Sequence, residues 1–203
     1  MKNDSDELLA DLAIQGDKDA FTVLVHRHID SLYGYAMRLT RSGSSADDLV
    51  QDTWLAAWRA MQGFNPNKAT LSTWLHRILH NKYIDGMRKS KLTYDSDKLA
   101  TLRDPYDAEQ AQTNTEHHER LETLISKLPQ NQKAAVALTY AQGFSNAEVA
   151  HILGLRLRAV ESLLARARKS LVANFAALGQ QTTSVETSTI QTPRSNHPHE
   201  ERI

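Results

Sequence analysis

Residues 145–160 read Ser-Asn-Ala-Glu-Val-Ala-His-Ile-Leu-Gly-Leu-Arg-Leu-Arg-Ala-Val, and this stretch decides the fold of the C-terminal half. Ser145 with Glu148 three residues later is the pattern of a capping box, which begins a helix. Gly154 suits the tight turn after this helix, and Val160 is placed to pack a second helix against the first. The stretch therefore predicts a helix-turn-helix unit.

The second helix of this unit is expected to have a buried stripe and a polar outer face. The stripe consists of apolar residues at three- and four-residue spacing, namely Leu157, Val160, Leu164, Ala167 and Leu171. At about 100° per residue, the outer face holds Arg158, Ser162, Ala165, Arg166 and Lys169. Such a face fits an ordinary solvated helix. It also suits the major groove of DNA, and the agreement of cap, turn and stripe favours DNA binding.

The rest of the chain predicts an all-α fold with two small helical domains. Residues 5–92 and residues 120–174 have apolar positions at helical spacing, without a useful strand alternation. Residues 93–119 lack this spacing and are acidic, which predicts a flexible linker. Residues 175–203 include a stretch rich in Ser and Thr, and we expect them to form a disordered tail.

Two helices of the first domain carry outward-facing polar residues. One is expected to begin at Ser45, to be capped with the help of Asp48, and to bury Trp54 and Trp58. A later helix begins near Ser72, and its outer stripe holds Arg77, His80, Asn81, Ile84, Arg88 and Lys91. This stripe is a candidate for phosphate contacts, and Asn81 at its centre can both donate to and accept from a base.

The composition of the 203-residue chain excludes several classes of protein. Lys and Arg together number 24, as do Asp and Glu, so a net charge of zero argues against an indiscriminate nucleic-acid binder. The chain has no Cys, begins without a secretion signal, and lacks an apolar run near the ~20 residues of a membrane span. We therefore expect a cytoplasmic protein without membrane insertion.

No catalytic site, metal site or cofactor is expected either. His76 and His80 stand four residues apart, but no Glu lies between them as it does in a metalloprotease helix. We interpret the two histidines as an incidental pair on a surface helix. The sequence also lacks a phosphate-binding Gly loop and a nucleophile elbow. It therefore indicates a binding protein and not an enzyme.

Four runs of residues, in a fixed order, resemble a known family. They are Ala46-Asp-Asp-Leu-Val-Gln-Asp-Thr-Trp-Leu-Ala-Ala-Trp58, Ser72-Thr-Trp-Leu-His-Arg-Ile-Leu-His-Asn81, Leu128-Pro-Gln-Asn-Gln-Lys-Ala-Ala135 and Arg166-Ala-Arg-Lys169. Together they resemble the sigma-70 family of RNA polymerase sigma factors. The resemblance is to its short extracytoplasmic-function (ECF) group, which keeps the second and fourth conserved regions.

The resemblance implies a factor that binds core RNA polymerase, directs it to specific promoters, helps to melt them, and acts in a stress or environmental response. The residues that match the helix docking on the coiled coil of the largest polymerase subunit are Asp48, Leu49, Gln51, Asp52 and Leu55. An anti-sigma factor is a further partner that the family implies. The acidic linker matches the segment that follows the RNA path of the polymerase.

The resemblance also divides the contacts with promoter DNA between the two domains. Residues 63–71 and Asn81 match the part of the family that captures unstacked bases of the minus-10 element, with Arg77 and Arg88 beside them. The residues that match the helix binding the minus-35 element are Arg158, Glu161, Ser162, Arg166 and Lys169.

Glu161 and Leu163 depart from the family, which usually has Lys or Arg at the first position and often Arg at the second. Glu161 can pair with Arg158 on the helix surface, or it can accept a hydrogen bond from a cytosine amino group in the major groove. We expect Glu161 to lie near DNA. The departure also supports an alternative function, a sigma-like decoy that sequesters an anti-sigma factor.

Overall fold

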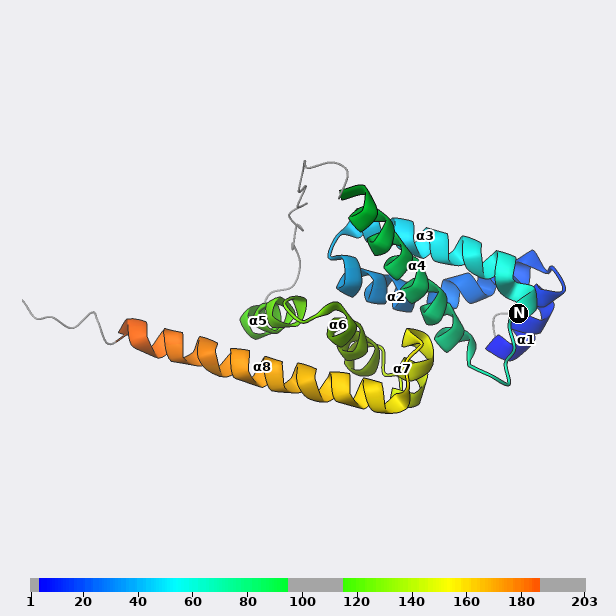
Figure 1. Ribbon diagram of the computed structural model, residues 1–203. Helices are drawn as coiled ribbons and strands as arrows, with labels where there is room; N and C mark the ends of the chain where they lie inside the picture. The colour runs from blue at the N-terminus through cyan, green and yellow to red at the C-terminus, as the bar shows by residue number, and fades with distance from the viewer. Residues whose placement is uncertain (1–3, 95–114, 187–203) are drawn as a thin grey trace, which may run out of the picture.

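The computed structural model describes residues 4–94 and 115–186, and every regular element in these two ranges is helical (Figure 1). The first range, here called the N-terminal domain, contains α1 (Asp6–Ile14), α2 (Lys18–Thr40), α3 (Gly43–Ala60), the 3₁₀ turn η1 (Met61–Gly63) and α4 (Leu71–Tyr94). The second range, the C-terminal domain, contains α5 (Thr115–Ser126), α6 (Gln130–Val136), the π-helical turn η2 (Ala137–Ala141), α7 (Asn146–Leu153) and α8 (Leu157–Glu186). The all-α prediction is confirmed. None of these described helices has the length and apolar character needed to traverse a bilayer.

Polar side chains cap the helices of the N-terminal domain. Asp17 accepts a hydrogen bond from the backbone nitrogen of Ala20 at 3.0 Å and begins α2. The cap of α3 is Ser42, whose Oγ accepts from the backbone nitrogen of Ser45 at 3.3 Å. The predicted helix start at Ser45 is therefore wrong by one turn. Ser42 already accepts the hydrogen bond from the backbone nitrogen of Ser45, which would otherwise lack a partner at the start of the helix.

The helix-turn-helix forms as the sequence predicts. The backbone nitrogen of Glu148 donates to Ser145 Oγ at 3.3 Å, and that of Ser145 donates to Glu148 Oε2 at 2.9 Å, which completes the capping box. Gly154 ends α7 in the left-handed region, with a φ of 65° that glycine adopts readily. Val160 is fully buried and packs α8 into the core of the domain.

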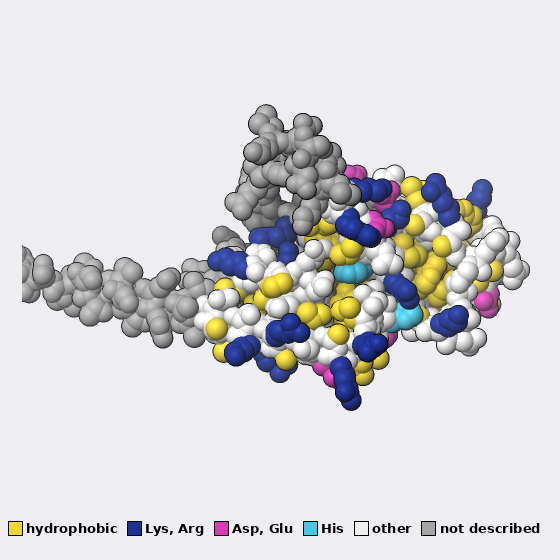
Figure 2. Space-filling view, in the orientation of Figure 1, with side chains coloured by type: hydrophobic (Ala, Val, Ile, Leu, Met, Phe, Trp, Pro, Cys, Tyr) yellow, Lys and Arg dark blue, Asp and Glu magenta, His cyan; other side chains and the backbone are white. Residues whose placement is uncertain are grey.

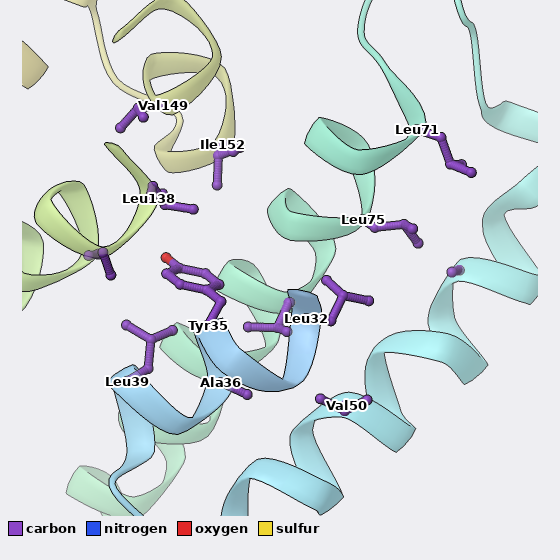
Figure 3. Close-up of a cluster of buried hydrophobic side chains, with 14 of the residues drawn as sticks. Leu32, Tyr35, Ala36, Leu39, Val50, Leu71, Leu75, Leu138, Val149 and Ile152 are labelled. Carbon is purple, nitrogen blue, oxygen red and sulfur yellow. The ribbon is translucent and has the colours of Figure 1, made fainter. Parts of the chain in front are cut away.

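Buried side chains of both domains form one continuous hydrophobic cluster. Figure 3 shows part of it, with Tyr35 and Leu39 of α2 facing Leu138 of η2 and with Val149 and Ile152 of α7 nearby. Between the two domains, α7 packs against α4 and η2 packs against α2 (Figure 1). The two domains are therefore in contact, whereas the sequence by itself gave no sign of an interface between them.

Three helices extend beyond the domain boundaries expected from the sequence. They end or begin at Tyr94 (end of α4), Thr115 (start of α5) and Glu186 (end of α8). No proline follows Pro129 until Pro193, so the backbone hydrogen bonding of α8 can continue past the expected end of the domain. The remaining parts of the expected linker and tail, residues 95–114 and 187–203, lie outside the described residues.

Candidate functional site

The residues predicted to bind the polymerase lie on α3. Those on its exposed face are Asp48, Gln51, Asp52 and Leu55. Leu55 exposes 49% of its surface, whereas Leu49 packs partly against the core. Because α3 begins at Gly43, Asp48 and Asp52 both stand beyond the first helical turn. The favourable effect of a helix dipole on carboxylates is confined to that turn, so it does not account for this acidic face.

An apolar groove between α2 and α3 borders the acidic face. Its apolar walls are Phe21, Val25, Trp54, Leu55 and Trp58. The Phe21 ring packs edge-on against both tryptophans, with ring centroids 5.7 Å from Trp54 and 4.8 Å from Trp58. Trp54 is buried as predicted, but Trp58 is only partly buried. Sequence analysis did not find this groove, because aromatic residues at helical spacing equally fit a closed core.

The residues predicted to bind the minus-10 element are exposed on α4. The side-chain amide of Asn81 has no hydrogen-bonding partner among the described residues. In contrast, Nη1 of Arg77 lies 3.3 Å from Nε2 of His151 on α7, and Nη2 of Arg88 donates to Oδ1 of Asp85 at 2.8 Å. The three predicted residues thus share the outer side of α4, and the two arginines already have protein partners.

His76 and His80 are buried, so the interpretation of them as an incidental surface pair is wrong, as is the outward position predicted for His80. Nδ1 of His76 donates to the carbonyl oxygen of Ser72 at 2.8 Å, and its ring packs edge-on against Phe144 of the C-terminal domain at 4.7 Å. Nδ1 of His80 shares a hydrogen bond of 3.0 Å with the Tyr35 hydroxyl. These partners belong to other elements, so the periodicity of α4 does not reveal them.

Burial keeps this cluster uncharged. It lowers the pKa of both His76 and His80 to about 4, and for His76 the hydrogen bond to Ser72 opposes this effect without outweighing it. Burial, aided by the nearby Tyr83, raises the pKa of the Tyr35 hydroxyl. At neutral pH both imidazoles are therefore neutral and bind their protein neighbours only through hydrogen bonds and ring packing.

The residues predicted to bind the minus-35 element are all exposed on α8: Arg158, Glu161, Ser162, Arg166 and Lys169. Figure 2 shows Lys and Arg side chains spaced along this helix, among apolar and uncharged ones. Nη2 of Arg166 donates to Oγ of Ser162 at 3.1 Å, which holds the guanidinium along the helix. Glu161 forms no ion pair with Arg158 in the part of the chain that the structure describes.

The buried stripe of α8 differs from the prediction at its first residue. Val160, Leu164 and Ala167 are buried as expected and Leu171 is partly buried against the core, but Leu157 is 45% exposed. It is the first residue of α8, directly after the turn, where the packed face of the helix has not yet begun. Arg168 donates from Nη2 to the Tyr140 hydroxyl at 3.0 Å and so connects α8 to η2.

Two family models match the chain in order: Sigma-70 region 2 over residues 24–93, and Sigma-70, region 4 over residues 118–171. The ECF RNA polymerase sigma factor SigM of Mycobacterium tuberculosis is 36% identical over 165 residues, which are 81% of each chain. The chain belongs to the sigma-70 family, in its ECF group. This sigma factor is a non-catalytic subunit of RNA polymerase that directs transcription initiation at specific promoters.

Two solved structures of similar proteins share the fold of this sigma factor. The structure of CnrH in complex with the cytosolic domain of CnrY has a TM-score of 0.65 at 32% identity, over 86% of this chain and 99% of that chain. RpoE from Bartonella quintana, in complex with the anti-sigma factor NepR, has a TM-score of 0.63 at 27% identity, over 76% of this chain and 95% of that chain.

Proposed function

We propose that this sigma factor contacts core RNA polymerase through the exposed face of α3 formed by Asp48, Gln51, Asp52 and Leu55, with Leu49 behind it. The observation that carries this proposal is the acidic pair Asp48 and Asp52, which is exposed on a helix whose other side is committed to the core. Neither residue serves as a helix cap. Carboxylates that are exposed to solvent and do not stabilise the fold are available to bind charged groups of a partner protein.

The apolar groove beside this face supports the same partner. Phe21, Trp54 and Trp58 offer packed aromatic walls, and Leu55 connects the groove to the acidic face. Interfaces are strongest where a buried apolar centre is surrounded by a polar rim. A helix of the polymerase coiled coil that places apolar side chains in the groove and basic side chains on Asp48 and Asp52 fits this surface.

We further propose that DNA contacts are divided between the domains, with the minus-10 element bound by residues 5–92 and the minus-35 element by residues 120–174. On α4, Asn81 supplies base discrimination while Arg77 and Arg88 contact phosphates. On α8, Arg158, Ser162, Arg166 and Lys169 contact the upstream element. Glu161 lies close to the same DNA, which is supported by its exposure and by the lack of an Arg158 pair among the described residues.

We propose that an anti-sigma factor regulates this protein. We also propose that the sigma factor acts in the cytoplasm, during a stress or environmental response. The support is the likeness to RpoE, which was solved with its anti-sigma factor NepR. The likeness to SigM across both domains favours an initiating factor over a sigma-like decoy.

Reversal of the acidic pair tests the polymerase contact. In Asp48→Lys/Asp52→Lys, the fold should persist because both side chains are exposed, and co-purification with core polymerase should be lost. The matched control is Asp11→Lys/Asp30→Lys, which makes the same change of net charge at exposed positions of α1 and α2. Circular dichroism of both double variants checks the fold.

The two variants separate a specific contact from a general charge effect. Loss of binding in the α3 variant alone supports the proposed face. If both variants bind core polymerase as the wild type does, the face lies elsewhere; if both lose binding, overall charge and not Asp48 and Asp52 is responsible.

A further inference from the structure

A seam runs between the C-terminal half of α2 and the α6–η2 segment of the other domain. Ser31 Oγ of α2 donates to Gln142 Oε1, directly after η2, at 2.7 Å. Further along α2, a Cβ added to Gly34 would lie 3.3 Å from Arg38 Nη1 and 3.6 Å from Gln142 Nε2. The guanidinium of Arg38 and the amide of Gln142 are therefore neighbours at this seam.

Three cationic side chains lie along the seam and are here called the seam cluster: Arg38, Arg41 and Lys133. Nη1 of Arg38 donates to the carbonyl oxygen of Gly34 at 2.9 Å, which holds the guanidinium along α2. Arg41 ends α2, and Lys133 of α6 lies close enough to Arg41 for the two positive charges to repel each other. The cluster thus brings together cations from both domains.

The seam cluster carries positive charge that the protein does not balance. Burial lowers the pKa of the Lys133 ammonium, and repulsion from Arg41 lowers it further. In the described part of the chain, none of the three cations forms an ion pair with a carboxylate. The dipole at the C-terminus of α2 favours Arg38 and Arg41, but it does not explain why a lysine of another helix lies beside them. An anion bound at the seam would remove the repulsion.

The backbone of Arg41 indicates that its side chain has a role. Among the described residues other than glycine, Arg41 alone has a positive φ, at 58°. Glycine is the usual residue at such a helix end, because a Cβ is strained in the left-handed conformation. Glycine would therefore suit this turn better than arginine. Residues held in such conformations cluster at functional sites.

The spacing of the cations favours linked phosphate groups as the ligand. Guanidinium groups bind phosphate oxygens with two parallel hydrogen bonds, and an ammonium adds a point charge. The Arg38 guanidinium lies beside Gly34, which is seven residues from Arg41 and thus about 10 Å away along the axis of α2. Carboxylates on one side of an extended peptide are about 7 Å apart, whereas linked phosphates place several charges within the same length.

We propose that the seam cluster binds a small molecule with two or more linked phosphate groups, either pyrophosphate or a nucleoside triphosphate, across the junction of the two domains. Arg41 and Lys133 contact the phosphates from the two sides of the seam, and Arg38 binds the end that lies toward Gln142. This inference does not rest on the proposed polymerase and promoter contacts, which involve other residues.

A ligand at this junction is coupled to the contact between the domains. A ligand that needs cations of both domains binds the arrangement in which they are packed together. It stabilises this arrangement by an amount that grows with the ligand concentration relative to its Kd. The concentration of a phosphate compound thereby regulates the sigma factor directly.

Titration of the full-length protein with pyrophosphate, at constant ionic strength, tests the site. Isothermal titration calorimetry should show one binding site in the wild type. In Arg41→Gln/Lys133→Gln the affinity should fall at least about tenfold, because two charge-assisted contacts are lost. The matched control is Arg59→Gln/Arg156→Gln, which removes the same charge from one exposed position in each domain. This control should bind as the wild type does.

The single variants show whether both domains contribute. Arg41→Gln and Lys133→Gln should each weaken the binding of pyrophosphate, and circular dichroism verifies the fold of every variant. If the wild type does not bind pyrophosphate, or if the double variant binds it as tightly as the control, the site does not exist. Loss of affinity in one single variant alone would place the ligand on one domain and overturn the bridging site.

Further probes distinguish the sources of the phosphate groups. Inorganic phosphate should bind more weakly than pyrophosphate, because it reaches fewer of the cations. Equal affinities for ATP and pyrophosphate would show that the phosphates alone are recognised, and a higher affinity for ATP would identify a nucleotide as the ligand. If the double variant loses binding of a single-stranded oligonucleotide or of a tetraglutamate peptide, but not of pyrophosphate, the proposal of a small-molecule site is overturned.

Arg41→Gly separates a binding role from a structural one. In buffer without phosphate this variant should have a higher Tm than the wild type, because glycine adopts the left-handed conformation without strain and the repulsion on Lys133 is removed. Pyrophosphate should raise the Tm of the wild type and of Arg59→Gln/Arg156→Gln, but not that of Arg41→Gly. A lower Tm for Arg41→Gly without ligand, or an equal rise with pyrophosphate in all three proteins, would overturn the assignment of Arg41 to an anion site.

Discussion

At the scale of single residues, Asn81 and Arg88 are the two positions on one helix face for which we propose different kinds of DNA contact. Both side chains are exposed on α4. An amide offers a donor and an acceptor in fixed positions and can distinguish one base from another, whereas a guanidinium binds any phosphate. The structure adds that Arg88 pairs with Asp85, while Asn81 has no such partner within the described ranges.

Substitution of these two residues should therefore have different effects. Asn81→Ala should reduce discrimination at one position of the minus-10 element by about 1 to 3 kcal/mol, the usual scale of one base contact. Arg88→Ala should weaken binding to all sequences and flatten the dependence of affinity on salt, because a phosphate contact is lost. Competition binding of holoenzyme to a panel of single-base promoter variants, at two salt concentrations, measures both quantities. An unaltered sequence preference in Asn81→Ala would place the base-reading residue elsewhere.

At the scale of elements, the sequence predicts a helix well where a local signal specifies its end. The Ser145–Glu148 pair and Gly154 delimit α7 as predicted, because capping and left-handed turns depend on residues close together in the chain. The start of α3 was missed because Ser45 has an acidic residue three positions later, as a capping box requires, whereas the actual cap, Ser42, has Ser45 at that position and caps through its Oγ alone. The exposed acidic face of α3 was predictable for a different reason, since it follows from helical periodicity alone.

The capping box gives a prediction for the helix-turn-helix. Ser145→Ala removes the Oγ that accepts from Glu148 and should lower the stability of the C-terminal domain by about 1 kcal/mol. For a chain of this size that corresponds to a decrease in Tm of about 2 to 4 °C. Ser145→Thr keeps a hydroxyl and should lose less than half of that. Thermal melts followed by circular dichroism measure the three proteins, and equal Tm values for Ser145→Ala and wild type would contradict a role of the cap in stability.

At the scale of the whole molecule, sequence reasoning does not reveal how the domains meet. His76 and His80 look like surface residues when α4 is considered alone, and they are buried because Tyr35 and Phe144 cover them from distant parts of the chain. Resemblance to a family identifies each domain by its own motifs and says nothing of their mutual contact. Non-local packing of this kind has no local sequence signal, so it required the structure.

The shared apolar centre predicts that the two domains unfold together. All three tryptophans, at positions 54, 58 and 74, lie in the N-terminal domain, so their fluorescence reports that domain alone, while far-ultraviolet circular dichroism reports helices of both. For the wild type and Gly34→Ala at pH 7.5, both probes should give one transition at the same Tm. A Cβ on Gly34 of α2 would lie 3.6 Å from Nε2 of Gln142 in the C-terminal domain, so the larger side chain of Gly34→Leu should push the two domains apart. In this variant, circular dichroism should show an additional transition at lower temperature that fluorescence lacks, because the smaller C-terminal domain loses its burial against Tyr35. Separate transitions in the wild type, or coincident ones in Gly34→Leu, would show that this contact does not couple the domains.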